Sequence, residues 1–522
     1  MFDKWLKVPA HYYLRITALT ILIVGIAVSN VLMSIGAIWI ISNWLIEADF
    51  KNYSLRLKQR PEVWLILGFL AYSILTLVWS DDFWYGFKDI KIKLPLLAIP
   101  LALGTGKPLE TKVFNFILYV FIGIVAYTSV YNFIWYNYFL DSPTDIRQMS
   151  KFISQIRFAT LVDLAIFSCV FLLFEKRLKI FLAAPLVAWF VFYMFKSQVL
   201  NGYVLFVILF IYSIYFGVRQ LKLRALKWSI TLISLVLLLA SVFVINNTIK
   251  TYRGIDKPVI SELEQFTLNG NPYYHDATIL QTENGHFVWL YVSQIELENE
   301  WNKRSSIKYD SLDNKNQPMF GTILRYMTSK EIKKDSVGIW QLTEEEIKLI
   351  ENGCTSVEMN NGVEAKVHSF LYEYDMYKAG ANPNGFSLLQ RLEHLKTAKL
   401  ILADYWLFGV GIGDVDLIFQ EYYVKSNSKL FPENRLRAHN QFISLWIGLG
   451  LLGLVVMILI FIIPLLKNKT NHYFLVITIM ALAISFMFED TLETQAGATI
   501  FALFYSIAVF REREIVKDKV DR

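Results

Sequence analysis

The residues best suited to chemistry lie near residue 440, where a histidine, an asparagine and spaced glycines follow one another. His439 and Asn440 are followed after nine residues by Gly450, and Gly453 comes three residues later. An imidazole titrates near neutral pH and can accept a proton from a hydroxyl group. Small residues allow another helix or a lipid chain to approach closely. A single histidine at a membrane surface is more often a polar anchor, but this combination of residues is specific.

A second group of candidates precedes the histidine. Gly409, Gly411 and Gly413 alternate with apolar residues and could present backbone N–H groups to a phosphate, although a tight turn that returns the chain to a membrane is the better interpretation. The residues 414–416 spell the DxD of metal-dependent sugar-nucleotide transferases, but they follow a glycine loop instead of a strand. We therefore predict no metal site and no cofactor. The HExxH, GxxxxGK[ST], GxSxG and CxxC motifs of soluble enzymes are absent from the sequence.

The composition indicates which elements must position these residues. Of the 522 residues, 55% are hydrophobic and only 18% are charged, whereas soluble domains carry about 25% charged residues. The apolar residues form long blocks, and Lys and Arg cluster at the block ends. This pattern excludes a soluble enzyme, a disordered chain and a fibrous protein, and it indicates a lipid bilayer as partner and no nucleic acid. Cys169 lies in an apolar block and Cys354 in a polar stretch, so we expect no disulfide.

Each apolar block of about 20 residues is long enough to cross a bilayer as a helix. The long first block is divided at Ser29-Asn30, where two polar residues can turn. The block at 88–104 contains Pro95 and Pro100, and it is alternatively a re-entrant or surface segment. The sequence thus predicts twelve helices, near residues 12–29, 31–47, 62–80, 88–104, 113–140, 157–174, 178–195, 198–217, 226–246, 440–466, 472–488 and 495–510.

The distribution of basic residues sets the predicted topology. Lys and Arg are concentrated in alternate connections, as in cytoplasmic loops, and one opposite connection is purely acidic (Glu489, Asp490 and Glu493). Both termini are therefore predicted in the cytoplasm. We predict an all-α polytopic membrane protein with an N-terminal transmembrane bundle over 1–246, an outer loop domain over 247–438, and C-terminal transmembrane helices with a short basic tail over 439–522.

The predicted outer domain carries helix signals of its own. Thr343 and Glu346 have the spacing of a capping box, and Gly353 fits a C-terminal stop. A second helix is predicted over 387–404, where leucines recur near one face. The many aromatic residues of this domain could stack on sugar rings, but a small core with an interfacial belt is the simpler interpretation.

The residues from about 385 to 455 resemble a known family. The pattern of His439, Asn440, Gly450 and Gly453 is similar to the signature of the O-antigen ligase and polymerase superfamily. The segments 391–398 and 404–411 also look like the sequence that precedes the histidine in that family, and the helix count and single large outer loop agree with it. The resemblance implies a GT-C-like membrane fold.

What the resemblance implies is glycan transfer outside the bacterial cytoplasmic (inner) membrane, with the large loop in the periplasm. The donor would be a glycan on undecaprenyl diphosphate, and the acceptor another glycan such as lipid A core, with no metal and no nucleotide sugar. His439 would be the general base for inverting attack by an acceptor hydroxyl, and Arg391 would bind the diphosphate in a fork. Further candidate substrate ligands are Arg157, Arg437, Asn440 and Lys196, and the structural motif comprises Gly409, Gly411, Gly450 and Gly453.

Two questions stay open at the level of the sequence. Many relatives carry a Ser-Arg pair near the position of Ser197, where this chain has Ser197-Gln198, so Arg157 or Lys196 compensates or the anion site is built differently. Arg435 is better interpreted as a headgroup anchor. The leading function is an O-antigen ligase; the alternatives are a repeat-unit polymerase, a protein O-oligosaccharyltransferase and a lipid-glycan flippase. The absence of internal repeats and the long outer loop speak against the flippase.

Overall fold

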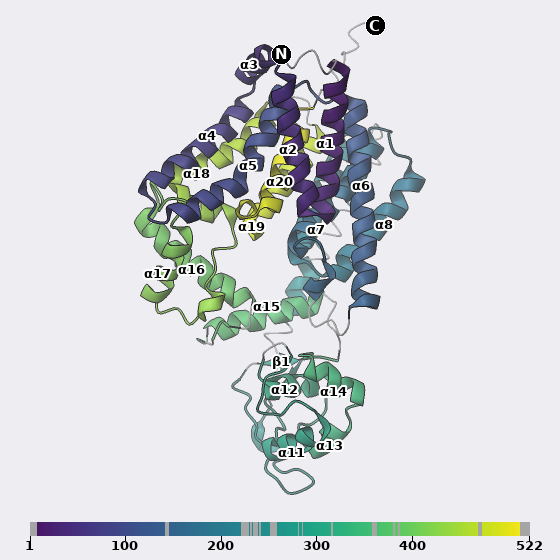
Figure 1. Ribbon diagram of the computed structural model, residues 1–522. Coiled ribbons are helices and arrows are strands. Elements are labelled where there is room, and N and C mark those ends of the chain that lie inside the picture. Colours follow the sequence, from purple (N-terminus) through teal and green to yellow (C-terminus); the bar gives the residue numbers. More distant parts are fainter. Residues whose placement is uncertain are drawn as a thin grey trace. The chain divides into compact units, whose positions relative to one another are not determined.

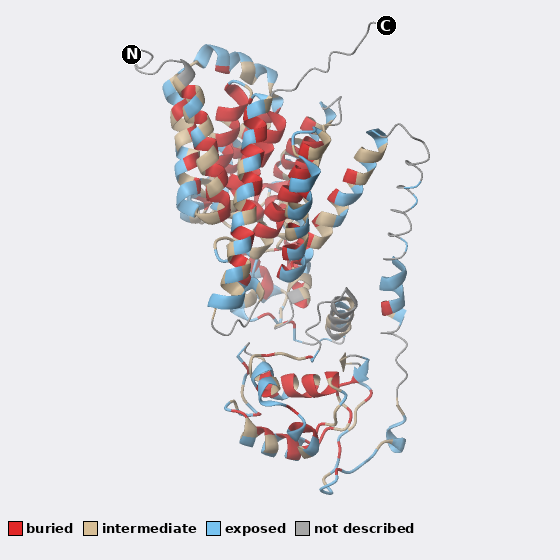
Figure 2. Ribbon diagram, turned by 90° about the vertical axis from the view of Figure 1, so that its right-hand side faces the viewer, coloured by how far each residue is buried: buried red, intermediate tan, exposed pale blue. Residues whose placement is uncertain are grey.

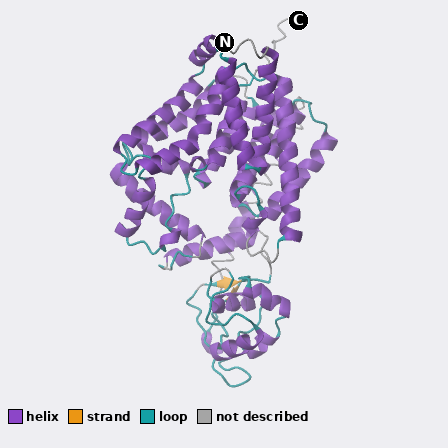
Figure 3. Ribbon diagram, in the orientation of Figure 1, coloured by secondary structure: helices purple, strands orange, loops and turns teal. Residues whose placement is uncertain are grey.

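The computed structural model is mostly helical (Figure 3) and divides into two compact units. The first unit comprises Met1–Asp141, Ile146–Thr231 and Arg391–Arg522, and the second comprises Leu232–Gln390 with Ser142–Asp145. The structure describes residues 8–140, 146–220, 242–250, 258–279, 281–283, 285–314, 317–357, 363–378, 382–384, 387–467 and 472–511, together with the single positions 229, 232, 239 and 380.

Long apolar helices make up the first unit (Figure 1). Eight of the described helices are long and apolar enough to cross a membrane, and two shorter apolar helices, α19 and α20, accompany them. The chain is therefore a multi-pass membrane protein. The helices of this unit are α1 (Val8–Val28), α2 (Asn30–Glu47), α3 (Phe50–Gln59), α4 (Pro61–Leu75), η2 (Thr76–Trp79), α5 (Phe83–Thr105), α6 (Thr111–Ile134), η3 (Trp135–Phe139), η4 (Ile146–Met149), α7 (Gln155–Phe174), α8 (Ile180–Ser197), α9 (Leu200–Gln220), α16 (Ser387–Tyr405, which begins in the second unit), α17 (Val415–Lys425), η6 (Pro432–Asn434), α18 (Gln441–Leu466), α19 (Tyr473–Phe488), η7 (Thr491–Glu493) and α20 (Gln495–Val509).

The first two helices confirm the predicted division at Ser29-Asn30. Ser29 has extended backbone angles and caps α2, because its side chain accepts a hydrogen bond from the Leu32 backbone N–H. Glycine allows the two helices to pack closely: a Cβ atom at Gly25 would lie 2.3 Å from the backbone nitrogen of Met33. The predicted block at 88–104 is part of one continuous helix, α5, which runs through Pro95 and Pro100. The predicted helix at 226–246 lies mostly outside the described residues.

The core of the bundle consists of aliphatic and aromatic side chains on the inward faces of the helices (Figure 2). Phe114 of α6, Phe171 of α7 and Phe474 of α19 pack edge to face or tilted, with ring centroids 5.1–5.9 Å apart. Such aromatic contacts join helices that are distant in the sequence. They hold α7 and α19 together, and the ends of these two helices carry residues of the candidate site.

The second unit contains a small core around Trp301, Tyr326 and Met327, all less than 2% exposed. The predicted capping box is present: the Thr343 hydroxyl accepts from the Glu346 N–H, and the Glu346 carboxylate accepts from the Thr343 N–H. The unit ends at Gln390, so residues 391–438 of the predicted loop domain pack with the membrane helices instead. Its elements are η5 (Ile260–Glu262), the antiparallel pair β1 (Thr282–Glu283) and β2 (His286–Phe287), α11 (Gln294–Arg304), α12 (Met319–Ser329), α13 (Ser336–Trp340), α14 (Glu344–Glu351) and α15 (Val363–Lys378).

Candidate functional site

His439 sits at the entrance of α18, directly before the first helical turn. Asn440 is the N-cap of this helix: its side-chain oxygen accepts from the Ile443 N–H at 3.1 Å, and its amide donates to the Met487 carbonyl at 3.3 Å. His439 has a φ of +49°, a backbone conformation that non-glycine residues rarely adopt and that often marks functional sites. The asparagine thus fixes the start of the helix, and the backbone before it turns sharply to direct the imidazole.

The partner of this imidazole is a second histidine, His394 of α16. The two rings lie 5.3 Å apart between centroids. His394 is 1% exposed, and its Nε2 bonds the Asn434 carbonyl at 2.9 Å. Among the described residues its Nδ1 has no hydrogen-bond partner. Burial, together with Arg391, lowers the pKa of His394, so this ring is neutral at pH 7.

The surroundings of His439 keep it neutral as well. Burial, then the neighbouring His394 and then Arg391 lower the pKa of His439 from 6.5 to about 4. All three causes act in the same direction, since each penalises a positive charge on the ring. An unprotonated imidazole at neutral pH can accept a proton, which is what a general base requires.

His439 lines a cavity of about 450 Å³ in the first unit. Most of its polar wall is charged, with three arginines and four carboxylates. Burial raises the pKa of Asp490, whose carboxylate accepts from the Ser444 hydroxyl, to about 6. Of the predicted site residues, Arg157, Arg437 and His439 come together here. The lining residues are Arg157, Asp416, Phe419, Gln420, Arg435, Leu436, Arg437, His439, Glu489, Asp490, Glu493 and Thr494.

Arg157, at the start of α7, forms an ion pair with Glu489 through a single contact of 2.5 Å. The pair is not bidentate: Arg157 Nε and the second oxygen of Glu489 are both buried without a partner in the described chain. Burial raises the pKa of Glu489, although Arg157 and Arg391 act against this shift. The pair therefore leaves one buried donor and one buried acceptor without a partner among the described residues.

Arg391 lies one helical turn before His394 on α16. Within the described residues its guanidinium makes no hydrogen bond or ion pair, and its charge interacts with Arg147, Glu489 and His439. Burial and the like charge of Arg147 lower the pKa of Arg391. The guanidinium groups of Arg391 and Arg147 and the single carboxylate of Glu489 leave an excess of positive charge at this point, which favours a bound anion.

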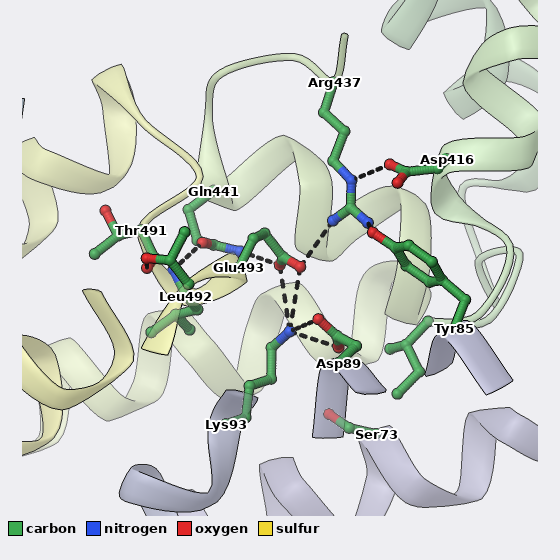
Figure 4. A network of polar contacts seen from close by, with 12 residues as sticks. Ser73, Tyr85, Asp89, Lys93, Asp416, Arg437, Gln441, Thr491, Leu492 and Glu493 are labelled. Carbon is green, nitrogen blue, oxygen red and sulfur yellow. Dashed lines mark hydrogen bonds and ion pairs between the residues drawn. The ribbon is translucent and has the colours of Figure 1, made fainter. Parts of the chain in front are cut away.

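Arg437 is also in the cavity wall, but protein partners hold its guanidinium (Figure 4). It donates to Asp416 at 2.5 Å and to the Tyr85 hydroxyl at 2.5 Å, and it pairs with Glu493 at 2.8 Å. Burial opposes its charge, yet Glu493 and Asp416 outweigh burial and raise the pKa of Arg437. Its predicted role as a substrate ligand would require these contacts to rearrange.

Beyond Arg437 the network continues into the bundle. Glu493 also contacts Lys93 of α5 at 3.3 Å and the Gln441 amide at 3.1 Å, and Lys93 pairs with Asp89 at 2.5 Å (Figure 4). Burial favours the neutral form of Glu493, but Lys93 and Arg437 more than offset this effect and lower its pKa. The network fixes the loop before α20 against α5 and α18, and so positions one side of the cavity.

The glycines of the two motifs meet and form one structural unit. Gly450 has a φ of +64° and a ψ of −169°, which breaks α18. The segment with Gly409 and Gly411 packs on this break, because Val410 N–H donates to Ile447 O and Gly411 N–H donates to Gly448 O, at 2.8 and 2.9 Å. A Cβ at Gly409 would lie 2.4 Å from the Gly450 nitrogen, and one at Gly450 would lie 2.3 Å from Leu407 O. Gly453 packs against the side chain of Leu449, one turn earlier on α18.

The two aspartates of the DxD have structural partners. The carboxylate of Asp414 accepts from the backbone N–H groups of Asp81 and Asp82, both at 2.8 Å, and Asp416 pairs with Arg437. No group of three or more His, Cys, Asp or Glu side chains suited to a metal ion occurs among the described residues. The DxD therefore ties the glycine segment to the loop between α4 and α5.

Lys196 and Arg435, the two basic residues whose roles the sequence left ambiguous, lie in different surroundings. Lys196 is exposed near the end of α8, 5.9 Å from the Phe192 ring centroid, and it is not a cavity residue. Arg435, which we interpreted as a headgroup anchor, lines the cavity, and its Nε donates to Leu430 O at 3.1 Å. At the position of the missing arginine, Gln198 ends α8 in the left-handed conformation. Of the two proposed substitutes, only Arg157 reaches the cavity.

The sequence interpretation missed three contributors: His394 and the carboxylates Glu489 and Asp490. His394 follows Arg391 by three residues on a correctly predicted helix, so the two share a face, and this spacing was an available signal. The acidic connection that contains Glu489 and Asp490 was used only to predict the membrane topology. Comparison of the sequence with family models and with curated proteins gives no match.

Proposed function

We propose that this chain is a membrane glycosyltransferase that moves a glycan from an undecaprenyl-diphosphate carrier to an acceptor sugar. The observation that carries the proposal is the placement of a neutral imidazole, His439, in the wall of a partly open cavity near Arg391 and Arg157. The O-antigen ligase pattern around His439 supports the same reaction. The reaction needs a proton acceptor and an anion site, and these residues supply both.

In the proposed reaction, His439 accepts the proton of an acceptor hydroxyl. The hydroxyl oxygen attacks the anomeric carbon of the donor, and the bond between that carbon and the diphosphate oxygen breaks with inversion. The diphosphate leaves with the bonding electron pair, and the proton is later released from the imidazolium. The guanidinium groups of Arg391 and Arg157 would stabilise the charge on the leaving group.

Donor binding would also improve the base. A diphosphate beside Arg391 would offset one of the charges that depress the pKa of His439. The pKa of the His439 imidazole would then be higher with donor bound than without it. The ring would therefore be a better proton acceptor when the substrate is present.

The proposed location is the outer side of the bacterial cytoplasmic membrane, with both termini in the cytoplasm and the second unit in the periplasm. The proposed acceptor is a lipid A core sugar. A repeat-unit polymerase would use the same base and the same carrier, so the product has to distinguish the two functions.

The test is a size profile of carrier-linked and surface-linked glycans from cells carrying wild-type protein, His439→Ala or the control His286→Ala. His286 lies on β2 of the second unit, and its side chain is half exposed. For a ligase, His439→Ala leaves long chains on the carrier and removes them from the surface. For a polymerase, it leaves single repeat units on the surface. A His439→Ala profile equal to that of wild type, at equal protein level, would refute the proposal.

A further inference from the structure

The membrane part contains an ionisable residue that the proposed glycan transfer does not use, Asp163 of α7. Its side chain is 0% exposed, and neither carboxyl oxygen has a hydrogen-bond partner in the described part of the chain. α7 packs against α6, α8, α9, α19 and η4. No charged or titratable group of these described elements acts electrostatically on Asp163. Almost every buried polar group in a protein has a partner, so this carboxyl requires an explanation.

A second unpartnered oxygen lies on the adjacent helix. Asn201 of α9 is 6% exposed, and its side-chain oxygen also has no partner among the described residues. The next residue, Gly202, brings α9 close to α7: a Cβ at Gly202 would lie 3.8 Å from Asp163 Oδ2 and 3.2 Å from the Ala159 Cβ. Two neighbouring helices thus each present a buried side-chain oxygen that has no hydrogen-bond partner within the described ranges of the chain.

An ionised carboxylate in this environment is strongly unfavourable. Removing such a charge from water without a counter-ion carries a large free-energy cost, and ionisable residues inside membrane spans usually mark proton or ion sites. Helix ends beside such residues often supply further oxygens to a small cation. α8 ends at Ser197 and α9 begins at Leu200, so the turn between these two candidate spans directly precedes Asn201.

We propose that Asp163 binds one monovalent cation, H⁺ or Na⁺, between α7 and α9. A proton would form an O–H bond with one carboxyl oxygen and supply the missing donor. A sodium ion would be coordinated by the carboxylate and by neighbouring oxygens. Either cation neutralises the charge and allows the close approach at Gly202. The site stands on the packing of α7 against α9 and does not depend on the proposed glycan transfer.

The experiment is infrared spectroscopy of the full-length protein in lipid vesicles, with ¹³C-labelled aspartate to separate aspartic from glutamic acids. Spectra of wild type and Asp163→Asn are compared in choline chloride and in sodium chloride. The matched control is Asp416→Asn, because Asp416 pairs with Arg437. We expect the carbonyl band of a protonated aspartic acid in wild type in choline, and its loss in Asp163→Asn but not in the control.

The sodium arm identifies the cation. A band that persists in sodium chloride assigns a proton, and a band that disappears there assigns a sodium ion that displaces the proton. Equal wild-type and Asp163→Asn spectra under both conditions would overturn the proposal. If Asp163→Asn does not fold, labelling of wild-type protein by dicyclohexylcarbodiimide, mapped by mass spectrometry, replaces it. Asp163 should then be labelled, and its absence from the labelled peptides at every pH would overturn the proposal equally.

Discussion

The low pKa of His439 leads to a prediction that tests the site without any assumed substrate. Diethyl pyrocarbonate reacts with neutral imidazole, so the rate of modification of a histidine follows its unprotonated fraction. With a pKa of about 4, His439 stays neutral down to mildly acidic pH. Its modification rate should therefore change little between about pH 7.5 and pH 5.5 and should fall to half only near pH 4.

The size of the effect separates this environment from an ordinary one. At about pH 5.5, an imidazole with a pKa of 6.5 is roughly 9% neutral, whereas one with a pKa of 4 is about 97% neutral. Lowering the pH from 7.5 to 5.5 should thus slow an ordinary histidine about tenfold and His439 by only a few per cent. Mass spectrometry of the peptide that contains His439 measures the rate directly.

Two variants make this measurement decisive. His439→Asn removes the modified peptide and confirms its assignment. Arg391→Gln removes one of the charges that lower the pKa of His439, so it should shift the midpoint upward. A wild-type midpoint near pH 6.5 would show that the imidazole is not desolvated, and the proposed neutral base would lose its structural basis.

Three further predictions concern single substitutions. Arg391→Lys should lower kcat/KM for the carrier-linked donor roughly ten- to hundredfold. Lys lacks the forked pair of guanidinium donors, and the loss of one charge-assisted hydrogen bond costs roughly 1.5–3 kcal/mol. Unchanged kinetics would contradict a bidentate contact. Glu489→Gln should tighten the binding of inorganic pyrophosphate about three- to tenfold in calorimetry, since the substitution releases Arg157 from its ion pair. Equal affinities of wild type and variant would argue against competition between Glu489 and pyrophosphate for Arg157. Gly450→Ala should destabilise the protein by roughly 2–6 kcal/mol, from roughly 1–3 for a positive-φ, extended-ψ backbone that is essentially confined to glycine and roughly 1–3 for the clash with Leu407 O. The Tm should therefore be lower than that of the control Gly68→Ala, whose Cβ would meet nothing within 4 Å.

Much of the helical structure was predictable because bilayer length and helix caps act locally. The division at Ser29-Asn30, the capping box at Thr343 and the extent of α16 are confirmed, since each depends on a few adjacent residues. The predicted twelve crossings and the topology remain predictions.

The geometry of the site was predictable only in part. His439, Arg157 and Arg437 line one cavity, but the pairing of Arg437 with Asp416 and Glu493 depends on segments far apart in the chain. The glycines were correctly interpreted as places of close approach, whereas their partner, another glycine segment, follows only from the tertiary structure. Lys196 lies at the end of a helix, as the sequence predicts, but it does not line the cavity. A position at a helix end does not determine toward which side of the bundle the side chain points.

The break in α18 has a consequence for biosynthesis. The segment 407–413 leaves the ribosome before residues 447–451, whose backbone supplies its hydrogen-bond partners. Until α18 arrives, the amides of Val410 and Gly411 lack these partners, and unpaired backbone groups are costly in an apolar environment. Chains that stop before about residue 447 should therefore expose this segment to quality-control proteases, even though every residue of the segment has been made.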